Sequence, residues 1–116
     1  MAKFKFKTSD NPTLDEVEET LDEIASIDSN EIPFNHLKKI AEYLGAVYEP
    51  HKGGSRRRFK HELLTKYHQY QHGYFGVDVI HSGKAEERAR KRDVVKYYLP
   101  AVRLLIIELK QKDQES

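Results

Sequence analysis

The sequence predicts an α+β fold in which a three-stranded antiparallel sheet is covered by helices on one face. Apolar residues recur at helical spacing near both ends of the chain, whereas the middle alternates at the two-residue period of strands. The expected element order is helix, helix, strand, strand, strand, helix. With 116 residues, 34% of them charged, the chain has the size of one small domain. This length excludes two-domain enzymes.

The first helix is predicted to begin after Thr13 and to end at about Ile27. The Thr13 side chain can accept a hydrogen bond from the amide of Glu16, while the Glu16 side chain reaches back to the amide of Thr13. The positions at helical spacing are apolar: Leu14, Val17, Leu21, Ile24 and Ala25. Most other positions are carboxylates, so we expect an extra, acidic helix at the N-terminus.

Two further helices are expected. One follows Pro33, whose fixed backbone angle suits a first helical turn, and it ends at Gly45, which supplies a left-handed stop. Its apolar positions are Leu37, Ile40, Ala41 and Leu44. The other covers about residues 86–110, with a local cap at Asp93 and a kink or restart at Pro100.

Three short strands are predicted over residues 46–49, 55–61 and 74–81. A tight reversal at residues 50–54 joins the first two strands into a hairpin. Residues 62–73 have weak periodicity, so we expect an extended loop or an irregular hairpin end there.

The basic second strand and the turn before it form the candidate binding site. Strand alternation places Arg56, Arg58 and Lys60 on one face, and a face this cationic does not enter a core. Glycines free backbone amides to approach an anion, and guanidinium groups fit phosphate oxygens. The residues predicted to contact phosphates of a polyanion are Lys52, Gly53, Gly54, Ser55, Arg56, Arg57, Arg58, Lys60 and Lys84. The alternative is a solvated edge strand protected by its charges.

Histidines and tyrosines offer further chemistry. His61 and His81 end the second and third predicted strands, where two imidazoles could act as general acid and base; the alternative is a half-exposed histidine at each strand end. His68 and His72 are spaced as in a helical zinc site, but no cysteine or well-placed carboxylate completes it. We therefore expect no metal and no other cofactor. Several aromatic residues either stack unpaired bases or pack on the sheet edge: Tyr67, Tyr70, Tyr74 and Phe75.

The charge is unevenly distributed along the chain. Residues 1–31 carry three lysines against nine acidic residues, and residues 32–110 carry sixteen basic against eight acidic residues. The basic part favours nucleic acid or another polyanion as partner, while the acidic part is either a solvated helix or a shield of the basic face. The absence of cysteine excludes disulfides and a cysteine nucleophile, and it fits the cytosol. No apolar run is long enough to span a bilayer, so we expect a soluble cytoplasmic protein with no membrane partner.

The order of elements resembles the HicA family of small toxins from bacterial toxin–antitoxin pairs. The resemblance covers about residues 31–109. Residues 37–46 are similar to the first helix of that family with its terminal glycine, and residues 54–59 to its glycine-serine turn and second strand. Residues 79–84 lie where the third strand of the family ends in a turn.

This resemblance implies a fold like the double-stranded RNA-binding domain (dsRBD), metal-independent cleavage of messenger RNA, and neutralisation by a HicB-type antitoxin. The family places its catalytic histidine just after the glycine-serine pair, where this chain has Arg56 and Arg57. Arginine stays protonated, so it can stabilise an oxyanion but cannot take the proton of a ribose 2′-hydroxyl. Either His61, His81 or His51 then acts beside Arg56, or the chain binds RNA without cleaving it.

The resemblance also divides the chain into an N-terminal extension (residues 1–31), a HicA-like domain (residues 32–110) and a polar tail (residues 111–116). Three functions follow as hypotheses. The first is a HicA-like RNA-directed toxin, and the second is a non-catalytic RNA-binding module of the same fold. The third is a protein-interaction module whose basic face binds an acidic partner such as an antitoxin.

Overall fold

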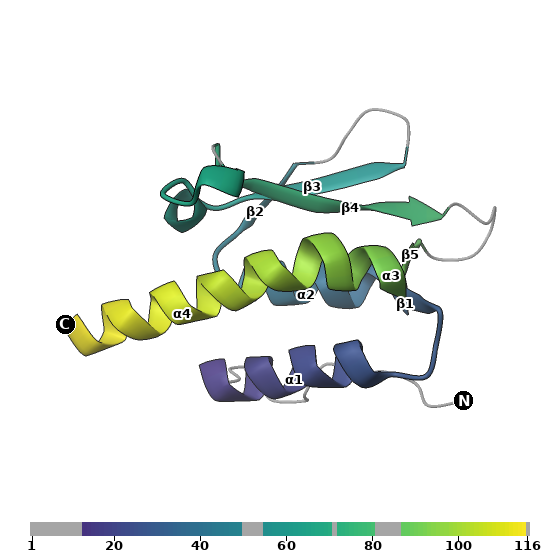
Figure 1. Ribbon diagram of the computed structural model, residues 1–116, viewed down its shortest axis with the longest axis horizontal. Helices are drawn as coiled ribbons and strands as arrows, with labels where there is room; N and C mark the ends of the chain where they lie inside the picture. The colour runs from purple at the N-terminus through teal and green to yellow at the C-terminus, as the bar shows by residue number, and fades with distance from the viewer. Residues whose placement is uncertain (1–12, 50–54, 71, 81–86, 116) are drawn as a thin grey trace.

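The structure is a computed structural model that describes residues 13–49, 55–70, 72–80 and 87–115. Within these residues the chain forms an α+β fold with a five-stranded antiparallel sheet in the order β1-β5-β4-β3-β2. The helices α2 and α4 lie against one face of the sheet, and α1 packs against α4 on the side away from the sheet (Figure 1). No helix formed by the described residues covers the other face of the sheet.

The helices and strands have the following bounds. The strands are β1 (Glu31–Pro33), β2 (Val47–Glu49), β3 (Arg56–Lys60), β4 (Tyr74–Ile80) and β5 (Arg88–Arg90). The main helices are α1 (Leu14–Ser26), α2 (Phe34–Tyr43) and α4 (Leu99–Glu115). A short helical turn α3 (Lys91–Asp93) and a π-helical turn η3 (Val94–Tyr98) lead directly into α4, and two 3₁₀ turns are η1 (Glu62–Leu64) and η2 (His68–Tyr70).

The prediction of three strands is wrong, because β1 and β5 extend the sheet to five. These two strands pair with each other, with Ile32 opposite Ala89, and β5 also pairs with β4. The expected helix from residue 86 consequently begins only at Lys91. Each added strand has three residues and only one buried apolar side chain, which is too short a pattern to show a period.

The three predicted strands are confirmed within a residue or two as β2, β3 and β4. The alternation in β3 is also confirmed: Arg56, Arg58 and Lys60 are exposed, whereas Arg57 and Phe59 are buried. The reversal predicted at residues 50–54 lies outside the described residues.

The helix signals at α1 and α2 are confirmed. The capping box between Thr13 and Glu16 is formed, with both hydrogen bonds at 3.1 Å. Helix α1 ends at Ser26, one residue before the predicted end, and α2 is followed by Gly45 at φ +94°, where only glycine is unstrained. The buried stripe of α1 contains Val17, Thr20, Leu21 and Ile24.

The kink or restart predicted at Pro100 is confirmed as a restart, because the α-helix α4 begins at Leu99, directly before the proline. The π-helical turn precedes it, and the amide of Leu99 donates to the carbonyl of Val94, five residues earlier. Because proline has no amide hydrogen, the carbonyl four residues before Pro100 receives no helical hydrogen bond from it. The π-helical turn accommodates this missing bond, and α4 then continues as an α-helix to Glu115. The side-chain cap expected at Asp93 is not formed. No helix in the described part of the chain is long and apolar enough to span a membrane.

Residues 62–70 form two 3₁₀ turns in place of the expected extended loop or irregular hairpin end, and α4 packs against this segment. The carboxylate of Glu108 accepts a hydrogen bond from the Tyr67 hydroxyl at 2.6 Å and forms an ion pair with Lys66 at 2.5 Å. Together the hydrogen bonds from Lys66 and Tyr67 lower the pKa of Glu108. These partners are distant in sequence, so local periodicity could not reveal them.

The acidic face of α1 pairs with cations of α4. Lys110 contacts both Asp15 at 2.7 Å and Glu18 at 2.5 Å, and Arg103 contacts Asp22 at 3.0 Å. Since α1 lies beyond the helix layer, the described part of the acidic segment does not shield the basic strand (Figure 1).

We predict that Gly76→Ala destabilises the sheet. A Cβ on Gly76 would lie 2.1 Å from the carbonyl oxygen of Arg57 on the neighbouring strand, so the backbones of β3 and β4 would have to separate. The expected loss is about 1–3 kcal/mol of unfolding free energy, measured by urea denaturation. Ser55→Ala, at an exposed position beside the same strand pair, is the control and should change stability by less than about 0.5 kcal/mol. Equal stability of the two variants would contradict this account of Gly76.

Candidate nucleic-acid interface

The candidate interface is the sheet face opposite the helices, called the open face below. Directly paired residues of antiparallel strands point to the same face, so the strand register identifies its members. Arg56 lies opposite Asp78, Arg58 opposite Gly76, and Lys60 opposite Tyr74. The same reasoning adds further charged residues from the other strands: Glu31, Glu49, Arg88 and Arg90.

Cations outnumber carboxylates on the open face. Among the described residues it carries five cations and three carboxylates. Three of the cations contact carboxylates on neighbouring strands: Arg56 with Asp78 at 3.5 Å, Arg58 with Glu49 at 3.2 Å, and Arg88 with Glu31 at 3.5 Å. All six side chains are at least one-third exposed, so solvent screens these pairs and each is worth less than about 1 kcal/mol. A ligand phosphate can therefore replace these carboxylates at little cost.

An aromatic ring lies among the cations. The guanidinium carbon of Arg58 is 4.2 Å from the centroid of the Tyr74 ring, and the ammonium nitrogen of Lys60 is 5.3 Å from it. The Tyr74 hydroxyl donates to Glu49 at 3.3 Å. The open face thus combines positive charge with an ordered ring and a guanidinium group.

Arg57 does not belong to the open face. Its side chain is 10% exposed and forms two hydrogen bonds with the Glu87 carboxylate, just before β5. The hydrogen bond with Glu87 raises the pKa of the Arg57 guanidinium further. A third donor group of Arg57 contacts the carbonyl of Arg56 at 3.1 Å. The RNA-binding role expected for Arg57 stays a prediction, and its geometry gives it a structural task, which is to join β3 to the start of β5.

His61 uses both ring nitrogens within the fold. Its Nδ1 accepts a hydrogen bond from the amide of Leu63 at 3.1 Å, which begins the turn η1. Its Nε2 therefore carries the proton and donates to the carbonyl of Leu44 at 3.0 Å, at the end of α2. An imidazole held in this way connects α2 to η1. The catalytic role expected for His61 stays a prediction.

The structure brings together only part of the predicted site. Arg56, Arg58 and Lys60 share the open face, and Ser55 is exposed beside β3, its carbonyl accepting from the amide of Val79 at 2.8 Å. Several predicted residues lie outside the described part of the chain: His51, Lys52, Gly53, Gly54, His81 and Lys84. No group of three or more histidine, aspartate or glutamate side chains that could hold a metal is found in the described residues.

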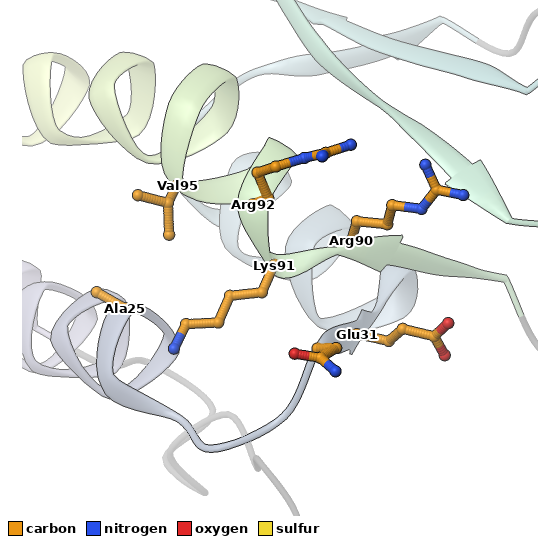
Figure 2. Close-up of a pocket in the computed structure, with 7 residues that line it drawn as sticks. Ala25, Glu31, Arg90, Lys91, Arg92 and Val95 are labelled. Carbon is orange, nitrogen blue, oxygen red and sulfur yellow. The ribbon is translucent and has the colours of Figure 1, made fainter.

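The basic stretch at residues 84–96 is predicted from the sequence to be either a solvated helix start or a contact to a nucleic-acid backbone, whereas Arg88 and Arg90 lie in the strand β5. Arg90, Lys91 and Arg92 line a shallow pocket between β5 and the end of α1 (Figure 2). The Lys91 side chain points toward α1, where its ammonium group donates to the carbonyl of Ile27 at 2.6 Å. Lys91 thus stabilises the C-terminus of α1, as a cation does at the negative end of a helix dipole. In the sequence, β5 is marked by the alternation of Arg88, Ala89 and Arg90, which is too short to show a period.

We predict that His61→Ala lowers stability, because the amide of Leu63 and the carbonyl of Leu44 both lose a partner. The expected loss is about 1–3 kcal/mol in the free energy of unfolding, measured by urea denaturation. His72→Ala removes an exposed imidazole and is the control. If the His61 variant keeps full stability, the structural role is refuted, and loss of RNA cleavage in such a folded variant would favour catalysis.

Comparisons with known proteins give no relative for this chain. No family model, no curated protein and no solved structure matches it. The function is therefore argued from the residues and the geometry of the open face.

Proposed function

We propose that this chain is a HicA-like RNA-binding domain whose open sheet face contacts RNA. The observation that carries the proposal is the row of Arg56, Arg58 and Lys60, exposed side by side along β3 on a face with excess positive charge. Phosphate contacts of this kind supply most of the affinity of proteins that bind nucleic acids.

The arrangement of the central elements supports a dsRBD-like core. Helix α2, the strands β2, β3 and β4, and helix α4 follow the order α-β-β-β-α, and the three strands are neighbours in the sheet. Both helices lie on the same face (Figure 1). This order and layering agree with the fold that the HicA resemblance implies, and in this proposal β1, β5 and α1 are additions to it.

Binding is favoured over cleavage by the described residues. Cleavage through the 2′-hydroxyl needs a base, and both nitrogens of His61 are already hydrogen-bonded to the backbone. Arg57, at one of the positions where the family has its histidine, is paired with Glu87. Arg56 is exposed, and it can hold a phosphate but not accept a proton. A HicB-type antitoxin would inhibit such a protein by covering the open face.

RNA binding is tested by fluorescence anisotropy with a labelled mixed-sequence RNA over a range of salt concentrations. We expect affinity to fall steeply with salt, because each neutralised phosphate releases counterions. The double variant R56Q/K60Q should bind more weakly and reduce the slope of log affinity against log salt by about 1.4, which is about 0.7 for each lost contact to a single strand. The double variant K39Q/K112Q, with the same loss of charge at exposed positions on the helices, is the control.

The same samples decide between binding and cleavage. Incubation with RNA in a chelator should leave the RNA intact, whereas fragments ending in 2′,3′-cyclic phosphate would support a metal-independent ribonuclease. If RNA binding is independent of salt, or if the two double variants behave alike, the open face is not the RNA contact. Preferential binding of an acidic protein would then favour the interaction module.

We further predict that Asp78→Asn strengthens RNA binding. Asp78 competes with phosphate for Arg56 across a 3.5 Å contact in which both side chains are more than half exposed. The expected gain is about two- to five-fold at low salt, the range for an exposed pair, and it should vanish at high salt. Asp28→Asn, at an exposed position beyond the end of α1, is the matched control in the same anisotropy assay. Equal gains in both variants would show a general charge effect.

A further inference from the structure

Arg58, Tyr74 and Glu49 form a connected group across three neighbouring strands. The guanidinium of Arg58 lies over the Tyr74 ring at 4.2 Å, and both Arg58 and Tyr74 hydrogen-bond to the carboxylate of Glu49, at 3.2 and 3.3 Å. One oxygen of Glu49 accepts from Arg58 and the other from Tyr74. These contacts hold the Arg58 guanidinium in one place on the open face.

The outer side of this guanidinium is accessible. The Arg58 side chain is 45% exposed, and the ring of Tyr74 covers one side of it. The residue opposite Arg58 on β4 is Gly76, which has no side chain to cover the other side. Planar guanidinium groups and aromatic rings are the surfaces on which proteins stack unpaired bases.

The cations on β3 are spaced for a single strand. Side chains on one face of a strand are separated by two residues, or about 6.7 Å, so Arg56, Arg58 and Lys60 form a line along β3. This separation is close to that of neighbouring phosphates in an extended nucleic acid strand. A base connected to such a line of phosphates can reach the Arg58 guanidinium.

We infer that the open face binds an unpaired RNA strand along β3, with one base stacked on the Arg58 guanidinium that Tyr74 supports. This inference rests on the proposed RNA-binding function and adds the class of RNA to it. In a duplex the bases are stacked inside, so that only phosphates and riboses would meet the open face. The group of Arg58 and Tyr74 therefore distinguishes unpaired from paired RNA.

The test measures the affinity of the full chain for three labelled RNAs at one salt concentration. They are a single-stranded oligonucleotide, the same oligonucleotide with abasic riboses at its central positions, and the same sequence in a duplex. We expect the single strand to bind about 5-fold or more tighter than its abasic form, since one stacked base contributes at least that much. It should also bind tighter than the duplex, although the duplex has the higher charge density and charge alone would favour it.

Arg58→Lys assigns the effect to the guanidinium, because lysine keeps the charge and loses the plane. This variant should bind the base-bearing single strand about 5-fold more weakly and the abasic strand unchanged. Arg92→Lys is the matched control, because the Arg92 side chain is 76% exposed in α3, outside the open face; it should change neither affinity by more than about two-fold. Circular dichroism checks the fold of both variants, and the abasic comparison on the unmodified chain remains decisive if a variant does not fold.

The outcomes separate the two proposals. If the unmodified chain binds none of the RNAs, the proposed function itself is refuted. If it binds all three in a salt-dependent manner but does not distinguish the abasic strand, the RNA-binding function stands and base stacking is refuted. Equal losses in Arg58→Lys and Arg92→Lys would likewise refute the role of the Arg58 guanidinium.

Discussion

Phe59 is the centre of a cluster of aromatic rings that determines which face of β3 is buried. Its ring lies 5.3 to 6.4 Å from four others, contributed by both sides of the core: Phe34, Tyr48, Phe75 and Tyr98. Tyr98 in turn donates a hydrogen bond to the carbonyl of Leu37 at 2.6 Å, which fixes the last helix against α2. Because side chains alternate along a strand, burying Phe59 forces Arg58 and Lys60 outward. The basic open face is thus a consequence of the core.

The same alternation places Arg57 on the buried face, where an unpaired cation would be costly. Glu87 accepts two of its hydrogen bonds and removes that cost, and Phe34 donates its amide to the Glu87 carbonyl at 2.9 Å. The pair therefore ties the start of β5 to both β3 and α2. Of the three consecutive arginines, Arg56 and Arg58 are exposed on the open face, whereas Arg57 holds the strands together. The number of arginines therefore overstates the positive charge that a ligand can reach.

Hydrophobic periodicity in the sequence predicted the helices and strands that are long enough to show a period. It also predicted which face of β3 is exposed. It could not show β1 and β5, since each has a single buried apolar residue, Ile32 or Ala89. The hydrogen bond of the His61 Nε2 is equally invisible in the sequence, because its partner is the carbonyl of Leu44 at the end of α2, seventeen residues earlier in the chain. The carboxylates among the cations were equally hidden, because only the strand register places Asp78 opposite Arg56 and Glu49 opposite Arg58.

The ion pairs of the chain differ in how easily a ligand can replace them. Arg57 and Glu87 are close, and the Arg57 side chain is only 10% exposed, so loss of Glu87 would leave a buried guanidinium without its carboxylate. The contact between Arg56 and Asp78 is long, and both side chains are exposed. A phosphate can therefore replace the Asp78 carboxylate, which water then solvates. Each such exchange releases a carboxylate as well as counterions. An RNA bound in this way gains modest affinity from each contact and loses it readily as salt increases. In the proposed complex, a contribution that does not depend on charge, such as a base stacked on Arg58, would then decide which RNA remains bound.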